Sequence, residues 1–249
     1  MMHFLIAPDF PPELIAGWHL LNTYLQRKCD CQMHLYIPHS SQEQYDILRQ
    51  GKIDLIFANP FDAAKLVRHV GYLPAVRPKG VSNEMVIATS AESAIKKIDD
   101  IQPKMKVALT KNYDIRLVGL RLLEPADVTE QDLEWIVMPS YQSVARAVIT
   151  KEVDVGFFVK GSFDSLNRLT KAKIHTVIES HLRDISHMLL IHPRNKDTSL
   201  PEFQKVMIDM TSDPNGSSIL KEIGMPNGFE ILTREDCEFL IDLMDTLLD

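Results

Sequence analysis

Cysteine is scarce in this chain of 249 residues, which contains three: Cys29, Cys31 and Cys237. An odd number of cysteines cannot form a fully paired disulfide framework, and a bridge between Cys29 and Cys31 would be strained. A C-x-C pair without a second pair or a nearby histidine cluster also lacks the usual spacing of a zinc site. We therefore expect free thiols in a reducing compartment, with no metal and no cofactor.

An excess of basic residues is also missing. The chain has 27 Lys and Arg residues against 34 Asp and Glu residues, which gives a formal net charge of -7. This negative charge repels the phosphate backbone of nucleic acids and anionic lipids at long range, so we expect no nucleic-acid partner. The sequence also contains no uninterrupted apolar run of the length that a bilayer requires, and we expect no membrane insertion.

A secretory leader is not evident at the N-terminus, which reads MMHFLIAPDFPPELIAGW. This stretch lacks a positive n-region, and Pro8, Asp9 and Pro11 interrupt its apolar residues. As written, the sequence predicts a cytoplasmic protein. If a leader has been removed, the prediction changes to the periplasm.

Sequence motifs of catalysis are absent as well. The nine histidines are scattered, and H-E-x-x-H, G-x-G-x-x-G and the P-loop do not occur. We therefore predict a binding protein without catalytic residues. An enzyme remains an alternative, because catalytic triads are assembled in space and not along the sequence.

A repeat is the most informative feature that is present. Residues 51–62 read GKIDLIFANPFD, and residues 151–164 read KEVDVGFFVKGSFD. Asp54 and Asp154, like Phe57 and Phe157, are 100 positions apart. Each copy is a short apolar run ended by a polar turn, which is typical of a strand buried on both faces of a parallel sheet. The repeat predicts two lobes of similar construction.

Strands and helices alternate along most of the chain, which predicts an α/β fold whose lobes are mostly parallel sheets flanked by helices. Expected strands are 3–7, 33–38, 53–58, 72–76, 84–89, 106–109, 134–138, 153–159, 174–179 and 186–192. Expected helices are 13–28, 42–50, 61–69, 93–101, 114–123, 141–150, 201–212 and 233–248.

The pattern starts again after residue 89, and the tail lacks the βαβ units of a third domain. We expect lobe 1 to comprise 1–88 and 189–249, and lobe 2 to comprise 89–188. Two crossings, near 87–92 and 185–190, would then join the lobes as a hinge that closes on a ligand.

The order of elements, together with GKIDLIFANP and the run ARAVITKEVDVGFF at 145–158, resembles the type II periplasmic-binding-protein fold. Within it, the whole chain resembles the phosphonate-binding-protein-like (PhnD-like) family of bacterial solute-binding proteins. That family has a Ser/Thr-rich helix start in its second lobe. This sequence has Thr110-Lys111-Asn112-Tyr113 there and keeps only the hydroxyl of Thr110 from that pattern. The resemblance implies non-catalytic binding of a small anion such as phosphate or a phosphonate, with an ABC permease as partner.

Ligands of open α/β sheets lie beyond the carboxyl ends of the strands, where helix N-termini attract anions. Ser140 is the best anion donor by chemistry, although a serine at a helix start equally serves as a cap. Lys111 and Lys160 would neutralise an anion unless they are solvated surface lysines. The candidate ligand-binding residues are Asp9, Phe10, Asn59, Phe61, Thr110, Lys111, Tyr113, Ser140, Tyr141 and Lys160, with His187 near the second crossing.

Asp54 and Asp154 are predicted to be structural, because each stands at a strand start, where a carboxylate can fix the preceding turn. The function is expected just after the repeated strands: binding of a small polar, anionic ligand by lobe closure, for sensing or uptake. Two alternatives remain open, a cytoplasmic enzyme of the same fold of the menaquinone-pathway type and an effector-sensing module read by a signalling protein.

Overall fold

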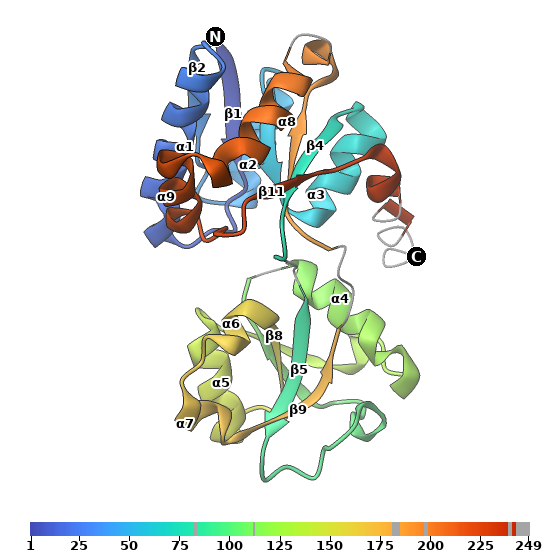
Figure 1. The fold of residues 1–249 in the computed structure, drawn as a ribbon. Helices are drawn as coiled ribbons and strands as arrows, with labels where there is room; N and C mark the ends of the chain where they lie inside the picture. The colour runs from blue at the N-terminus through green and yellow to red at the C-terminus, as the bar shows by residue number, and fades with distance from the viewer. Residues whose placement is uncertain (82–83, 112, 181–184, 197–198, 239–240, 243–249) are drawn as a thin grey trace. The chain divides into compact units, whose positions relative to one another are not determined.

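A computed structural model describes the chain apart from residues 82–83, 112, 181–184, 197–198, 239–240 and 243–249 (Figure 1). Backbone contacts divide the chain into two compact units, Met1–Ser82 with Asp184–Leu248, and Asn83–Arg183. The lobe limits expected from the sequence, at 88/89 and 188/189, stay a prediction, as does the hinge. A limit at 88/89 would cut strand β5 (Met85–Ser90), whose pairing partners β8 and β9 both lie in unit 2.

Unit 1 contains a six-stranded sheet in the order β11-β4-β10-β3-β1-β2. Its strands are β1 (Met2–Ile6), β2 (Met33–Tyr36), β3 (Leu55–Ala58), β4 (Leu73–Pro78), β10 (Met188–Ile191) and β11 (Phe229–Ile231). β1 is parallel to β2 and β3, whereas β10 runs antiparallel to β3 and β4. The tail of the chain thus returns to this sheet and makes it mixed.

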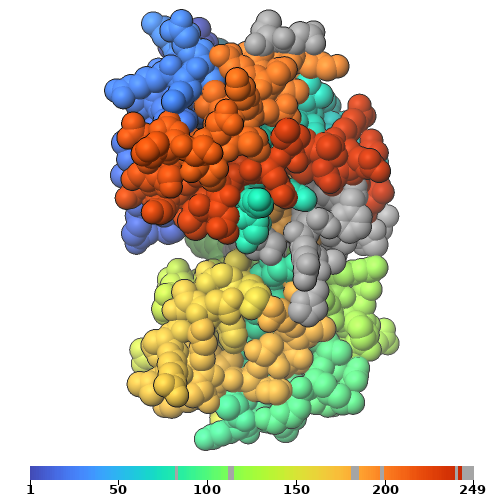
Figure 2. Space-filling model, in the orientation of Figure 1, coloured from blue at the N-terminus to red at the C-terminus, as the bar shows by residue number. Residues whose placement is uncertain are grey.

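Helices α1 (Ile15–Lys28), α8 (Leu200–Asp209) and α9 (Pro214–Glu222) pack on one face of this sheet. The core between them contains Phe4, Trp18, Phe57 and Phe203, all at most 1% exposed. Figure 2 shows α8 and α9 forming much of the near surface of unit 1. Helix α2 (Ser41–Arg49) precedes β3, and α3 (Pro60–Lys65), which continues into a π-helical turn at Leu66–Val70, contacts β3 and β10.

Unit 2 contains a five-stranded sheet in the order β7-β6-β8-β5-β9. Its other strands are β6 (Lys106–Leu109), β7 (Glu134–Val137), β8 (Val155–Val159) and β9 (Ile174–Glu179), and its helices are α4 (Tyr113–Leu123), α5 (Tyr141–Ile149), α6 (Lys160–Asp164) and α7 (Arg168–Lys171). α5 packs on Phe158, while α4 passes so close to Phe157 that a Cβ at Gly119 would lie 2.1 Å from its ring. The α/β fold class is confirmed.

The sequence repeat marks equivalent elements of the two sheets. Parallel strands β2-β1-β3 in unit 1 correspond to β7-β6-β8 in unit 2. Helices α2 and α5 both begin after a serine, Ser40 or Ser140, whose side chain accepts the backbone N–H three residues later. Both helices end before a residue with positive φ, Gly51 at 68° and Lys151 at 62°. The two halves are therefore built alike from the helix through the repeated strand.

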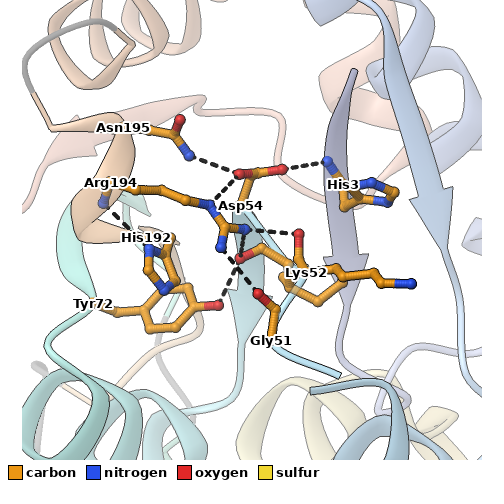
Figure 3. A network of polar contacts seen from close by, with 9 residues as sticks. His3, Gly51, Lys52, Asp54, Tyr72, His192, Arg194 and Asn195 are labelled. Atoms are coloured by element: carbon orange, nitrogen blue, oxygen red, sulfur yellow. Dashed lines mark hydrogen bonds and ion pairs between the residues drawn. The ribbon is translucent and has the colours of Figure 1, made fainter. Parts of the chain in front are cut away.

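The carboxylate of Asp54 joins three segments of unit 1 (Figure 3). It accepts hydrogen bonds from the backbone N–H of His3, from Arg194 Nε and from Asn195 Nδ2, each at 2.8 Å. Burial raises the pKa of Asp54, but the hydrogen bonds from Asn195, Arg194 and His3 outweigh it and hold the pKa below its usual value. Asp54 is thus structural as predicted. Arg194, which its carboxylate holds, also donates to the carbonyl oxygens of Gly51, Lys52 and Ile53, so the preceding turn is fixed through this arginine.

The predicted helix at 93–101 is wrong: only Ile98–Asp100 forms a short 3-10 turn. The side chains of Ser90 and Ser93 accept the N–H groups of Glu92 and Ile95, and such local bonds compete with a helix. Helix α9 and strand β11 were not predicted. Of the predicted helix 233–248, residues 234–238 and 241–242 are helical, and the rest lies outside the described residues.

Candidate functional site

The carboxyl ends of β1 and β3 form one edge of the unit 1 sheet, and the antiparallel β10 starts at the same edge. Asp9 and His187 meet there, with Asp9 Oδ2 3.1 Å from His187 Nε2. Their side chains are 26% and 14% exposed. Two predicted site residues 178 positions apart are therefore partners, and the carboxylate of Asp9 faces a histidine.

Aromatic rings surround this pair. The ring of Phe10 lies 4.8 Å from that of His187 and 4.9 Å from that of Trp18. Phe57 stacks on His187, with centroids 5.9 Å apart and an angle of 10° between the rings. Phe10 and His187 thus belong to one aromatic cluster at the edge of the unit 1 sheet, and Trp18 and Phe57 are the cluster members that the sequence analysis did not assign to the site.

The residues after β3 serve the start of helix α3. Asn59 caps this helix by accepting the N–H of Asp62 at 2.8 Å, and its Nδ2 donates to the Asp62 carboxylate at 3.1 Å. That carboxylate also accepts bonds from Gln44 and Tyr45 of α2, so it links two helices. Phe61 is 5% exposed and part of the core. Asn59 thus serves as a helix cap and Phe61 as a core residue, and a role of either in ligand binding stays a prediction.

In unit 2, parallel strands β7, β6 and β8 end at one edge of the sheet, and each is followed by predicted site residues. Thr110 and Lys111 follow β6, and the Lys111 side chain is exposed. Among the described residues, Lys111 has no ion-pair or hydrogen-bond partner. Tyr113 starts helix α4, but its side chain lies outside the described part of the structure.

Ser140 caps the nine-residue helix α5, which follows β7. Its Oγ accepts the N–H of Ser143 at 3.2 Å and lies 3.0 Å from the Ser143 hydroxyl. Ser140 therefore caps helix α5, and an additional role of its hydroxyl in ligand binding stays a prediction. Tyr141, next in the chain, is half-buried and its ring packs 6.1 Å from that of Phe158.

Lys160 follows β8, but its charge already has partners. The Nζ atom lies 3.1 Å from Glu179 Oε1 and 3.0 Å from Asp164 Oδ2. The hydrogen bonds that Lys160 donates to the carboxylates of Asp164 and Glu179 raise its pKa. The arrangement leaves Lys111, and not Lys160, as the unpaired cation after these strands in the described part of unit 2.

A buried carboxyl group at the same edge had no signal in the sequence. Glu84 is 7% exposed, and the hydroxyl of Ser180, 2% exposed, donates to it. The Ser180 hydroxyl also accepts the N–H of Met85 at 2.9 Å, which ties the start of β5 to the end of β9. The contact between Ser180 and Glu84, which are 96 positions apart, could not be predicted from local sequence patterns.

Two further properties bear on function. In the part of the chain that the structure describes, no group of three or more His, Cys, Asp or Glu side chains is placed to hold a metal ion. Within the same residues, no helix is both long enough and apolar enough to cross a bilayer.

Solved structures share this fold at low sequence identity. XAC2383 from Xanthomonas citri, bound to chloride ion, has a TM-score of 0.81 at 16% identity, with 100% of this chain and 98% of that chain covered. PhnD1 from Prochlorococcus marinus (MIT 9301), in complex with methylphosphonate, has a TM-score of 0.76 at 12% identity, covering 99% and 97%. The periplasmic aliphatic sulphonate binding protein SsuA from Escherichia coli has a TM-score of 0.67 at 14% identity, covering 98% and 86%. These similarities confirm the type II periplasmic-binding-protein fold.

No curated protein matches the sequence. The sequence model of one family does match, over residues 4–237, and its description is "ABC transporter, phosphonate, periplasmic substrate-binding protein". This family consists of substrate-binding proteins that bind small molecules and work with ABC permeases. The chain therefore belongs to the phosphonate-type periplasmic substrate-binding proteins of ABC transporters.

Proposed function

We propose that this chain binds a small oxyanion of the phosphonate or sulfonate type and delivers it to an ABC permease, without carrying out chemistry on it. The observation that carries this proposal is the edge of the unit 2 sheet where Lys111 and the start of helix α5 follow neighbouring parallel strands. This edge joins a positive side chain to a helix N-terminus, and both favour negative charge.

The charges in unit 2 support Lys111 as the anion's counter-ion. Lys160, the other candidate, is engaged by Asp164 and Glu179, so its positive charge is already balanced. Lys111 is exposed and has no such carboxylate among the described residues. An oxyanion beside Lys111 would gain a charge-assisted hydrogen bond without displacing an existing ion pair.

The first turn of α5 supports the same assignment. Helix N-termini leave backbone N–H groups without intrahelical partners. The side chain of Ser140 accepts the N–H of Ser143. Tyr141 and Gln142 are the two residues of the first turn that precede Ser143. Their N–H groups suit phosphonate or sulfonate oxygens, and the hydroxyl of Ser140 adds a further donor.

Relatives narrow the ligand class. The family description names phosphonate, and the PhnD1 structure holds methylphosphonate. SsuA is described as an aliphatic sulphonate binding protein, and XAC2383 was solved with chloride and with ATP. All these ligands are anions, which agrees with a site built on Lys111 and a helix start.

Uptake is the form of the function that the family favours, and it requires a periplasmic location. A sensing role would instead fit a cytoplasmic location. In either case we propose that the two units close on the bound ligand. A decrease of the radius of gyration on ligand addition, measured by small-angle X-ray scattering, would support closure, and an unchanged radius at saturation would contradict it.

A thermal-shift screen tests the proposed ligand class. A ligand that binds only the folded chain raises the melting temperature by mass action. The screen compares methylphosphonate, phosphite, phosphate, methanesulfonate and ATP with sodium chloride at equal ionic strength. We expect a saturable rise with a phosphonate or sulfonate, and a flat response to every oxyanion would contradict the proposal.

A further inference from the structure

A pocket of about 310 Å³ lies within unit 1 and reaches the edge of the sheet where β3 and β4 start. Gly51 and Tyr72, which line it, precede β3 and β4, and His192, which also lines it, follows the antiparallel β10. The predicted ligand-binding residues of unit 1 follow the other ends of these strands or lie near them, and none of them lines this pocket. The pocket also contains no residue of unit 2.

Much of the pocket wall is apolar. Leu48 of α2 lines it together with Leu66 and Val70, the first and last residues of the π-helical turn. Tyr45 and Tyr72 add two aromatic side chains. Turns of π-helix are rare and occur frequently at functional sites. This wall suits the apolar or aromatic body of a ligand.

Three lining residues belong to the network of Figure 3 and are held in place by it. The hydroxyl of Tyr72 donates to the carbonyl oxygen of Ile53 at 2.9 Å, and Arg194 Nη1 donates to the carbonyl oxygen of Gly51 at 3.0 Å. The backbone N–H of Arg194 donates to His192 Nδ1 at 3.2 Å, so a neutral imidazole carries its proton on Nε2. Because these walls are fixed before a ligand arrives, binding costs little ordering of the pocket.

The carboxylate in the wall, that of Asp62, is already engaged. Asp62 is 6% exposed, and its oxygens accept hydrogen bonds from Gln44 Nε2 at 2.6 Å, from the Tyr45 hydroxyl at 2.9 Å and from Asn59 Nδ2 at 3.1 Å. A ligand ammonium group would have to displace one of these bonds to reach it. Asp62 therefore does not make the pocket a cation site.

Two cationic residues also line the pocket, Arg49 and Lys65, and both are exposed. The side chain of Lys65 has no ion-pair or hydrogen-bond partner among the described residues. Arg49 lies 3.6 Å from Asp46, and an ion pair whose side chains are 78% and 57% exposed contributes little. With Asp62, the lining carries two positive charges and one negative charge, which matches a ligand with a single negative charge.

We infer that this pocket is a second small-molecule site of the chain and that it takes an aromatic carboxylate, with the ring against the apolar wall and the carboxylate beside Lys65 and Arg49. A carboxylate matches the charge of the lining, whereas a phosphate dianion exceeds it. The volume lies at the lower end of the range of ligand pockets, which suits a single ring or two fused rings. The site goes beyond the proposed function, because it shares no residue with the oxyanion site.

NMR titration of the isotope-labelled chain with phenylacetate tests the inference. Acetate lacks the ring, phenylacetamide lacks the charge, and phenethylamine reverses it. We expect saturable binding of phenylacetate, with acetate and phenylacetamide each at least about tenfold weaker and phenethylamine weaker still. No saturable binding of phenylacetate, or equal binding of its amide or of the amine, overturns the inference.

Two tryptophan substitutions locate the bound ring. Val70 lines the pocket and is 52% exposed, so Val70→Trp is expected to fill the pocket with little effect on folding. Leu20 of α1 is 48% exposed and does not line the pocket, which makes Leu20→Trp the matched control. We expect Val70→Trp to abolish phenylacetate binding and Leu20→Trp to preserve it. Undiminished binding to a folded Val70→Trp variant overturns the assignment.

Three lysine substitutions locate the bound carboxylate. We expect Lys65→Ala to weaken phenylacetate binding about tenfold, through loss of a charge-assisted hydrogen bond. Lys221 is exposed, lies on α9 and does not line the pocket, so Lys221→Ala should leave the affinity unchanged. Lys111→Ala should also leave it unchanged, because Lys111 belongs to the oxyanion site proposed for unit 2. A loss of phenylacetate binding in Lys111→Ala, with none in Lys65→Ala, would place the carboxylate in unit 2 and overturn the inference.

Discussion

Asp54 and His3 exchange two hydrogen bonds across neighbouring parallel strands. The N–H of Asp54 donates to the carbonyl oxygen of His3 at 2.9 Å, and the N–H of His3 donates to the Asp54 carboxylate at 2.8 Å. Asp154 and Lys106 repeat this exchange in unit 2, at 3.0 and 2.8 Å. The repeated aspartates therefore join β3 to β1 and β8 to β6 at the edge opposite the predicted ligand-binding residues.

Asp54→Asn is expected to lower the free energy of unfolding by about 2–3 kcal/mol, because it removes the charged acceptor of Arg194 in a largely buried site. Asp154→Asn should cost only about 1 kcal/mol, since Asp154 is exposed and has no arginine partner among the described residues. Urea unfolding followed by circular dichroism compares the two. Equal losses would contradict the difference assigned to Arg194.

The depressed pKa of Asp54 makes part of the stability dependent on pH. Because the folded-state pKa lies below the unfolded value of about 3.9, the stabilisation is complete above that value and is lost as the pH falls through the folded-state pKa. The stability difference between wild type and Asp54→Asn should be constant above about pH 5 and shrink below about pH 4. Urea unfolding of both proteins at a series of pH values from about 5 down to about 3 measures this stability difference. A stability difference that grows on acidification would be inconsistent with this account.

Gly51 and Lys151 occupy equivalent positions with positive φ after α2 and α5, and only one of them is glycine. A Cβ added at Gly51 would meet no atom within 4 Å, so Gly51→Ala should cost about 1 kcal/mol from backbone strain alone. Lys151→Gly should instead stabilise the chain by about 0.5–1 kcal/mol. Thermal unfolding of both variants checks the opposite signs, and a destabilised Lys151→Gly variant would refute the strain assigned to Lys151.

Ser40 and Ser140 provide a matched pair for separating capping from ligand binding. Each side chain caps its helix, so Ser40→Ala and Ser140→Ala should each lower stability by about 1 kcal/mol. Only Ser140→Ala should also weaken oxyanion binding, by about tenfold, through the lost hydroxyl donor. Calorimetric titration of both variants distinguishes the roles. Unchanged affinity in Ser140→Ala would limit that serine to capping.

Much of the fold was predictable because the repeated apolar strands are strong local signals. Helix α9 was not, because its Asn-Gly-Ser-Ser start has low helix propensity. Asp213 caps it, and tertiary packing maintains it: Ile219 and Leu220 are buried in the core of unit 1, and a Cβ at Gly17 of α1 would lie 2.8 Å from the Glu222 carbonyl oxygen. The helix expected at 93–101 failed for the opposite reason, since local serine bonds replaced a pattern that looked helical.

The site was predictable only as a set of loops. The rule that ligands lie beyond the carboxyl ends of strands identified Asp9, Lys111 and Ser140 as candidates. It did not show that Asp9 faces His187 or that Glu179 neutralises Lys160, because these partners are distant in sequence and meet only in the folded unit. Local patterns position side chains along an edge, whereas charge balance depends on the tertiary structure.

The most direct test of the account is calorimetric titration of methylphosphonate into wild type, Lys111→Ala and Lys106→Ala. Lys106 and Lys111 stand at opposite ends of β6, one starting the strand and one following it, so they differ in position and not in charge. The account predicts saturable binding to wild type, about tenfold weaker binding to Lys111→Ala through loss of a charge-assisted bond, and unchanged binding to Lys106→Ala. Equal affinity of Lys111→Ala and wild type would contradict the anion site proposed for unit 2.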